Sequence, residues 1–370
     1  MSNETRLSDV CDIQNGFAFD SSQFSESSGT PLIRIRDLKK NSCSLKFKGS
    51  YDESYIVRMG DILVGMDGEF RVYEWKGDDS LLNQRVCRLI PKAEKLDPYF
   101  LLYRIDQDLK KIEDQTPSTT VKHLSSLRIA SIKWKLPDLK KQREIAAKLK
   151  SQLAEVGTAR KALELQQKEV VNLANTLIRE SIEQSPVIET RLGEVLEEIK
   201  KGIGETWASY PVLGATRGGL APAKEQPGKY PQRYKPVSCG TVFYNPMRIM
   251  IGSIAFVDDD DEPGITSPDY VALQGKIGLI DSRWFYYWLR SPYGEQCINS
   301  LARGAVRERM LFNRLAEGTI LLPSYQEQLR ASNALATLKS MKFATQQQLK
   351  DLNKIPERLL AKAFDSLSTQ

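Results

Sequence analysis

Two stretches of the chain place apolar residues seven positions apart, the pattern of a helix that packs along a second helix. The positions are Leu149, Val156, Leu163, Val170 and Leu177 in the first stretch, and Leu338, Thr345, Leu352 and Leu359 in the second. This spacing predicts two long coiled-coil helices, over residues 138–184 and 324–367. At about 1.5 Å per residue, a helix of about 45 residues is roughly 65 to 70 Å long.

Two residues should disturb these helices, and one alternative packing has to be weighed. Gly157 weakens the first helix locally, and Pro356 predicts a kink near the end of the second. Each helix could instead pack separately on its own globular part, but neither has the wide apolar face that such packing needs. We therefore expect the helices to pair with each other. The pairing should be antiparallel, because a single chain has to return alongside itself.

The sequence that opens each helix is written twice. LPDLKKQREIAAKLK begins at Leu136 and LPSYQEQLRASNALATLK at Leu322, and each has a Gln five residues after its Pro. The offset of 322 − 136 = 186 positions recurs with small drift. It relates LSDV to LGEV, GDILV to GTVFY, PYFLLYRI to RWFYYWLRS, and Val121 to Val306. Matches in this order predict two diverged copies of one unit, a globular part of about 135 residues followed by a helix of about 45.

Each globular part mixes short strands with helices. The segments PLIRIRDL, DILVGM and QRVCRLI in the first copy, and GTVFYN, GSIAFV and DYVAL in the second, have the β-branched content of strands. The aromatic segments that follow have helical spacing. The pattern is therefore α+β: two similar domains separated by two long antiparallel coiled-coil helices, with a pseudo-twofold repeat. The predicted boundaries are 1–137 and 186–322 for the domains, and 138–185 and 323–370 for the helical segments.

Composition mainly excludes certain kinds of site and of protein. The net charge of +6 suits a polyanionic partner only mildly. The five cysteines are scattered, with no C-x-x-C pair, which favours reduced thiols over a structural zinc site. We expect no signal peptide, no membrane span and a cytoplasmic location. His123 is the single histidine, which excludes chemistry that needs two, and we interpret it as a partly exposed polar residue.

Three possible catalytic patterns are weak. The segment YNPM at Tyr244 lacks the second proline and the aromatic residue of an amino-methyltransferase motif. Gly202-Ile203-Gly204 follows a helical pattern and not the strand of a cofactor loop. A nuclease could use Asp258–Glu262, but consecutive like charges usually form a solvated hairpin tip, and Pro268-Asp269 only distantly resembles a magnesium-binding motif. We predict no catalytic or metal-binding residue.

Contact with duplex DNA is better supported. Arginine and glutamine pair bidentately with guanine and adenine in the major groove. In PLIRIRDL, arginines alternate with isoleucines, so a strand would present Arg34 and Arg36 on one face. For any single arginine, an ordinary surface ion pair is the alternative. The candidate DNA-contacting residues are Arg34, Arg36, Arg71, Gln84, Arg85, Lys122, Tyr210, Arg217, Arg248, Arg303, Arg307 and Arg309.

These features together resemble a known family. Over nearly its full length the chain is similar to the specificity subunit of type I restriction–modification systems. The first half carries the resemblance in IQNGFAFDSSQF, PLIRIRDL, GDILVGMDGEF and LLNQRVCRL, and the second in GTVFYNPMR, GITSPDYVAL and RWFYYWLRSP. The repeated Leu-Pro-x(4)-Gln openings match the repeated conserved regions of that family. Pro356 and the segment SYQEQLRASNAL depart from its smoother helix.

The resemblance implies a non-catalytic protein that directs enzymes. Each domain would read one half of a split target in double-stranded DNA, with the helix pair setting their separation. Two methyltransferase subunits would dock on the frame and bring S-adenosylmethionine, so the chain itself would bind no cofactor. A restriction and translocase subunit would join them. The alternative is a DNA-binding structural or defence adaptor that has no methyltransferase partner.

Overall fold

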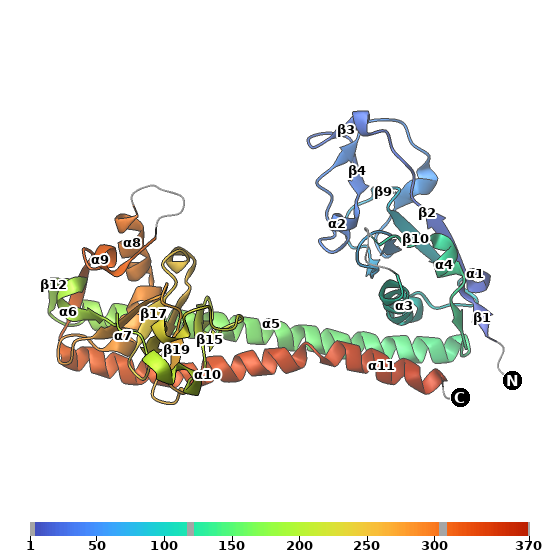
Figure 1. Ribbon diagram of the computed structural model, residues 1–370. Helices are drawn as coiled ribbons and strands as arrows, with labels where there is room; N and C mark the ends of the chain where they lie inside the picture. The colour runs from blue at the N-terminus through green and yellow to red at the C-terminus, as the bar shows by residue number, and fades with distance from the viewer. Residues whose placement is uncertain (1–3, 117–121, 303–308, 369–370) are drawn as a thin grey trace. The chain divides into compact units, whose positions relative to one another are not determined.

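The computed structural model describes residues 4–116, 122–302 and 309–368. The chain divides into two compact units, Met1–Lys161 with Lys350–Gln370, and Ala162–Leu349. Each unit contains one globular part and portions of the long helices (Figure 1). The unit boundary therefore runs through the helices, and the boundaries predicted for the recognition domains stay a prediction.

The first unit is built on an antiparallel four-stranded sheet in the order β2 (Cys11–Asn15), β10 (Val86–Pro91), β7 (Ile62–Gly65) and β8 (Val72–Glu74). A second sheet has the order β3 (Phe24–Ser25), β5 (Lys46–Phe47), β4 (Thr30–Ile33), β9 (Ser80–Leu82) and β6 (Ile56–Val57). The remaining strands and helices are β1 (Thr5–Arg6) paired with β11 (Lys133–Trp134), and α1 (Leu7–Val10), α2 (Ile35–Leu38), α3 (Pro98–Asp114) and α4 (Ser126–Ala130).

The second unit repeats the main sheet in the order β13 (Leu196–Glu198), β20 (Val271–Gly275), β17 (Val242–Tyr244) and β18 (Ile254–Phe256). Three two-stranded sheets accompany it, β12 (Val187–Arg191) with β21 (Thr319–Pro323), β14 (Leu213–Thr216) with β15 (Gly219–Pro222), and β16 (Lys235–Val237) with β19 (Gly264–Thr266). Its short helices are α6 (Leu192–Val195), α7 (Ser282–Arg290), α8 (Pro292–Leu301) and α9 (Phe312–Leu315). The two main sheets share strand order and direction, as two copies of one unit should.

The long helices follow the predicted spans closely. α5 covers Leu139–Glu183, 45 residues without a break. The second stretch forms α10 (Tyr325–Leu352) and α11 (Ile355–Ser368), separated by a turn at Asn353 and Lys354. Pro356 lies in the first turn of α11, where its missing N–H costs no helical hydrogen bond. The interruption that Pro356 predicted is therefore confirmed.

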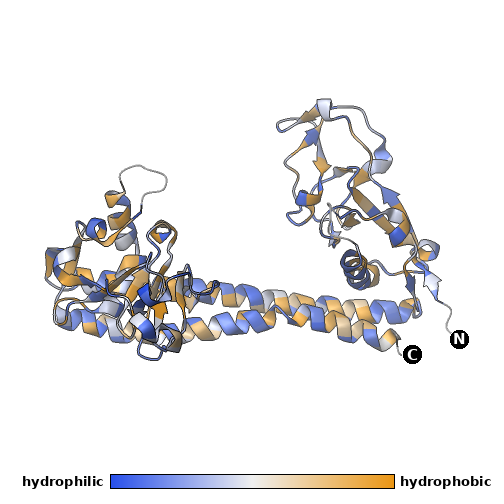
Figure 2. Ribbon diagram, in the orientation of Figure 1, coloured by the Kyte–Doolittle hydropathy of each residue, from blue (hydrophilic) through white to orange (hydrophobic). Residues whose placement is uncertain are grey.

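Of the seven-residue positions, Leu149, Val170, Leu338 and Thr345 are buried, and Figure 2 shows apolar residues recurring along the long helices. In the first unit, Ala146 and Leu149 of α5 belong to one core with Phe364 of α11. In the second unit, the later residues Val170, Ala174 and Ile178 of α5 share a core with Ala331, Leu335 and Leu338 of α10. Residue numbers rise along α5 while those of its partners fall, so the pairing is antiparallel, as predicted.

The repeated glutamine has the same structural role in both copies. Gln142 and Gln328 are buried, with exposed fractions of 1% and 0%. Gln328 Oε1 accepts from the Asp281 N–H at 2.8 Å, and its Nε2 donates to the carbonyls of Leu279 and Pro323 at 3.1 and 2.9 Å. Gln142 repeats this arrangement with the Asp97 N–H and the carbonyls of Lys95 and Pro137, at 2.9, 3.1 and 2.9 Å. Because Asp97 and Asp281 are the N-cap residues of α3 and α7, each glutamine fixes a globular part to the start of a long helix.

One strand prediction is wrong. The segment PLIRIRDL does not continue as a strand, because β4 ends at Ile33 and α2 begins at Ile35. Arg34 is the N-cap residue of α2, and the Asp37 carboxylate accepts from its backbone N–H at 3.0 Å. Arg34 and Arg36 therefore do not share a strand face. A local carboxylate cap competes with strand pairing here, and the alternating pattern could not reveal it.

Candidate DNA interface

Three loops of the first unit meet at one end of its main sheet. They are residues 66–71 between β7 and β8, residues 83–85 between β9 and β10, and residues 122–124. The Met66 N–H donates to the Arg85 carbonyl at 3.0 Å, and the Leu124 N–H donates to the Met66 carbonyl at 2.7 Å. We call this group the first loop cluster. It brings together four of the predicted residues, Arg71, Gln84, Arg85 and Lys122.

Those four side chains fall into two kinds. Gln84 and Arg85 are exposed, although Arg85 also pairs with Asp67 at 3.1 Å. The Arg71 guanidinium lies 3.3 Å from the Glu113 carboxylate, and the Lys122 ammonium donates to the Glu113 carbonyl at 2.7 Å. Arg71 and Lys122 therefore fasten the cluster to the C-terminal end of α3, where a cation is favourable. Gln84 and Arg85 are the pair placed to contact a ligand.

The two arginines beside α2 also differ. Arg34 is half-buried, and its guanidinium donates to Ser44 Oγ at 2.7 Å and to Asp37 at 3.4 Å. Arg36 is exposed. Of the two, Arg36 is free to reach a partner, and Arg34 stabilises the turn that presents it.

The second unit has an equivalent cluster at the same end of its sheet. We call residues 216–219, 245–253, 267–270 and 309–310 the second loop cluster. The Met310 N–H donates to the Pro246 carbonyl at 3.0 Å, Arg309 pairs with Asp269 at 3.4 Å, and Arg217 Nε donates to the Ile251 carbonyl at 3.0 Å. These contacts gather the predicted residues Arg217, Arg248 and Arg309.

Three predicted residues remain. Arg303 and Arg307 lie outside the residues that the structure describes. Tyr210 is 38% exposed and ends a short 3₁₀ turn, Gly204–Ser209. None of its contacts within the described ranges joins it to the second loop cluster.

The equivalence of the two clusters places His123 at the candidate interface, which was not predicted from the sequence. Leu124 and Met310 make the same backbone contact and lie 310 − 124 = 186 positions apart, the offset of the repeat. The preceding residues correspond in the same way. His123 Nδ1 lies 2.7 Å from an Asp67 carboxylate oxygen, and Arg309 pairs with Asp269. His123 is exposed, as expected, but it also belongs to the first loop cluster, and the offset was the signal that could have shown it.

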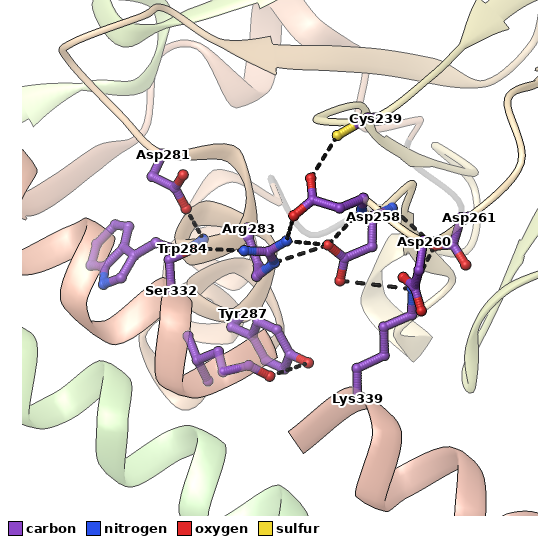
Figure 3. A network of polar contacts seen from close by, with 12 residues as sticks. Cys239, Asp258, Asp260, Asp261, Asp281, Arg283, Trp284, Tyr287, Ser332 and Lys339 are labelled. Atoms are coloured by element: carbon purple, nitrogen blue, oxygen red, sulfur yellow. Dashed lines mark hydrogen bonds and ion pairs between the residues drawn. The ribbon is translucent and has the colours of Figure 1, made fainter. Parts of the chain in front are cut away.

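The acidic run Asp258–Glu262 is only in part the solvated hairpin tip that the sequence indicated, because Asp259, Asp260 and Glu262 are exposed but Asp258 is not (Figure 3). Asp258 is only 5% exposed and accepts from Arg283 of α7. Arg283 also pairs with Asp259 at 2.7 Å, and Lys339 of α10 pairs with Asp261 at 2.9 Å and with Asp260. The carboxylates therefore converge on two cations from helices, which leaves the run poorly suited to bind a metal ion.

The two cations gain charge stabilisation from this arrangement. Burial disfavours the charged forms of Arg283 and Lys339, but their hydrogen bonds to the aspartates outweigh it and raise the pKa of both side chains. The hydrogen bond from Lys339 holds the pKa of Asp260 below its usual value. The network thus fixes the turn after β18 to α7 and α10. Among the described residues, no group of three or more histidine, cysteine, aspartate or glutamate side chains could hold a metal ion.

Cys239 is hydrogen-bonded to the same network, so its reactivity can be used to test the arrangement. It is exposed, yet its Sγ lies 2.9 Å from Asp259 Oδ1, and this hydrogen bond raises the pKa of the thiol to about 11. At pH 8 Cys239 of the wild type should react slowly with iodoacetamide, because little of the thiol is ionised. In the D259N variant the pKa of the thiol should fall, so the larger thiolate fraction should react roughly tenfold faster or more. Mass spectrometry of each cysteine measures this. Cys43, whose pKa burial raises to about 11, should not change and serves as the control. Rapid labelling of wild-type Cys239 would contradict the arrangement.

The Asn-Pro of YNPM has a structural place as well. Asn245 Oδ1 accepts from the Met247 N–H at 3.0 Å, which closes the turn after β17. This side chain is therefore occupied by its own loop.

None of the helices within the described ranges combines the length and the apolar character of a membrane span.

Comparison with known proteins agrees with the fold. A family model described as the type I restriction modification DNA specificity domain matches residues 2–166. The chain is 28% identical to the EcoBI specificity subunit of Escherichia coli, over 97% of this chain and 84% of that protein. It is 21% identical to the MjaVIII specificity subunit of Methanocaldococcus jannaschii, over 89% of this chain and 84% of that protein.

Solved structures show the same fold. The S subunit of a type I restriction–modification system from M. genitalium aligns over 98% of this chain and 96% of its own, with 16% identity and a TM-score of 0.53. A chain from a study of complex assembly and conformational transition of the type I system aligns over 98% and 97%, with 19% identity and a TM-score of 0.61. The α+β class with a long coiled-coil helix is confirmed.

Residues 2–166 therefore match the type I restriction modification DNA specificity domain. Along nearly its whole length the chain is similar to specificity subunits of type I restriction–modification systems. The resemblance seen in the sequence is confirmed.

Proposed function

We propose that this chain is a non-catalytic specificity subunit that reads a bipartite target in double-stranded DNA and directs partner enzymes to it. Residues 1–137 and 186–322 are then the two recognition domains, and residues 138–185 and 323–370 the helical spacers. The observation that carries the proposal is the pair of equivalent loop clusters, each at the same end of an equivalent sheet. Two half-sites on one duplex require two readers held at a set distance.

The proposed DNA contacts are the exposed residues of these clusters together with the exposed Arg36 of α2. Gln84, Arg85 and Arg36 would contact the first half-site, and Arg217, Arg248 and Arg309 the second. Arginine and glutamine read guanine and adenine edges, and arginine also neutralises phosphates. Arg71, Lys122 and Arg34 would act indirectly, because each is partly buried as well as engaged within the protein.

The catalytic activities would come from partner subunits. Two methyltransferase subunits would bind the helical frame, one for each repeat, and S-adenosylmethionine would be bound by them. A restriction and translocase subunit would join this assembly. The antiparallel pairing of α5 with α10 and α11 supports the number two, because it gives two repeats of one surface in opposite directions.

DNA binding should be sequence-specific only when the methyltransferase subunits are present. Titration of a labelled target duplex and a scrambled duplex, with and without the partner, measures this. The specific complex should weaken steeply with salt, by roughly 10³-fold between 50 and 200 mM if it makes about six phosphate contacts. Equal, sequence-blind affinity in both cases would refute the proposal. A chain that binds DNA but never co-purifies with a methyltransferase would support the adaptor instead.

A further inference from the structure

One loop of the second unit exposes an unusual amount of apolar surface. Residues Asn245–Gly252 connect β17 to β18. Met247, Met250 and Ile251 in this loop are 58%, 49% and 52% exposed. Single exposed apolar residues are common on protein surfaces, but three within five positions mark a candidate contact site.

The backbone of this loop is held in place from several directions. The Gly252 N–H donates to the Ile249 carbonyl at 2.8 Å, and Gly252 has a φ of 80°, a conformation that favours glycine. Ile249 is buried and anchors the loop in the core. Arg290 of α7 donates to the Gly252 and Ile254 carbonyls at 3.1 and 2.9 Å. The apolar side chains are therefore presented on a preorganised loop, which lowers the entropic cost of binding.

Unpaired positive charges surround the apolar tip. Arg217 contacts the loop through the Ile251 carbonyl, and Arg248 lies within it. Lys342 of α10 donates to the Gly218 carbonyl at 2.7 Å. Within the described residues, none of these three side chains, nor Arg290, takes part in an ion pair. Burial, and then the charge of Arg290, lower the pKa of Lys342.

The equivalent loop of the first unit has different chemistry. In residues 66–71, Phe70 is fully buried and the exposed positions are polar, as at Glu69. Its arginine, Arg71, pairs with Glu113. The two readers therefore present different surfaces at the same place in the fold, and only the second combines exposed apolar side chains with unpaired arginines.

We propose that the apolar tip Met247, Met250 and Ile251 contacts the 5-methyl group of thymine in the major groove of the half-site that the second unit reads. Thymine carries the only apolar group that the major groove displays, so an apolar side chain there selects an A·T pair in one orientation. Arg217 and Arg248 would neutralise phosphates beside it. The unpaired cations favour a polyanion over a protein partner as the occupant. The inference rests on the proposed function and adds the chemistry by which one half-site is read.

The test removes only the methyl group. The target is first defined by sequencing methylated sites in cells that contain the chain and its methyltransferase subunits. The purified complex is then titrated with duplexes in which each target thymine in turn is replaced by deoxyuridine. At one or two positions within a single half-site, deoxyuridine should weaken binding about fourfold, the effect of burying one methyl group.

A loop variant assigns the effect to these residues. In the M247S/I251S variant, binding to the thymine duplex should weaken, and deoxyuridine should make no further difference at the sensitive position. M59S is the matched control, because Met59 is 73% exposed but lies before β7, at the opposite end of the sheet from the first loop cluster. It should keep the full sensitivity to deoxyuridine.

Several outcomes would overturn the inference. They are a target in which neither half-site contains a sensitive thymine, or a sensitivity to deoxyuridine that the loop variant retains. Loss of the methyltransferase from the M247S/I251S complex would show that the loop binds protein. These outcomes concern the inference alone, because the wild-type complex can still bind the target more tightly than a scrambled duplex. Only a wild-type complex that bound both duplexes equally would count against the proposed function.

Discussion

Replacing Gln328 by alanine should destabilise the second unit by roughly 2–4 kcal/mol. Its side chain is fully buried, and it satisfies the Asp281 N–H and the carbonyls of Leu279 and Pro323. Alanine removes the partner of these three backbone groups, of which the Pro323 carbonyl is buried and the other two are partly buried, and opens a cavity, and each effect adds to the cost. The Asp281 amide, now unpaired at the N-terminus of α7, should exchange its hydrogen much faster. Hydrogen exchange measured residue by residue checks this.

The repeat supplies a second test and a control. Q142A should give the same loss in the first unit, with faster exchange of the Asp97 amide and no change at Asp281. Gln326 and Gln166 are exposed on the same helices, so Q326A and Q166A should be nearly neutral. Residue-level exchange is the better readout, because a chain of two units need not unfold in one step. If Q328A exchanged like Q326A, the anchoring role of the repeated glutamine would be wrong.

The periodic parts of the sequence predicted the fold well. The first long helix was expected over residues 138–184 and is found at Leu139–Glu183, and Pro356 marked the interruption between α10 and α11. A seven-residue spacing is a local property that survives in any long helix, so the sequence alone shows it. The 186-residue offset likewise predicted the shared order of the two main sheets.

The site was predicted less completely, because its side chains depend on partners far along the chain. Arg71 and Arg85 look alike in sequence, but Arg71 meets a glutamate 42 positions away, and Arg85 lies exposed in a loop. The acidic run gave no sign of Arg283 or Lys339, whose contacts with it span 25 and 79 positions. Neither does a sequence show that the turn after β17 leaves its methionines exposed. Tertiary contacts decide all of these cases.

Inserting one heptad into each helix of the coiled coil should lengthen the spacer of the DNA target without changing either half-site. Seven residues after Leu163 in α5, matched by seven after Thr345 in α10, keep the seam positions beyond each insertion in register, since Val170 of α5 and Leu352 of α10 stay on the contact face. The added helix is about 10.5 Å long. That corresponds to about three base pairs at roughly 3.4 Å each. Only the number of unspecified base pairs between the half-sites should therefore grow.

A substitution in a recognition domain should change one half-site and leave the spacer length unchanged. R36A removes an exposed side chain, so it should weaken or relax one half-site and leave the spacer length unchanged. Sequencing of methylated sites in cells that carry each variant separates the two effects, because it reports half-site sequences and their spacing together. The inserted residues touch neither loop cluster, so a change in half-site sequence would mean that the insertion had disturbed the readers. An active insertion variant that kept the original spacer would show that the helices do not set the distance.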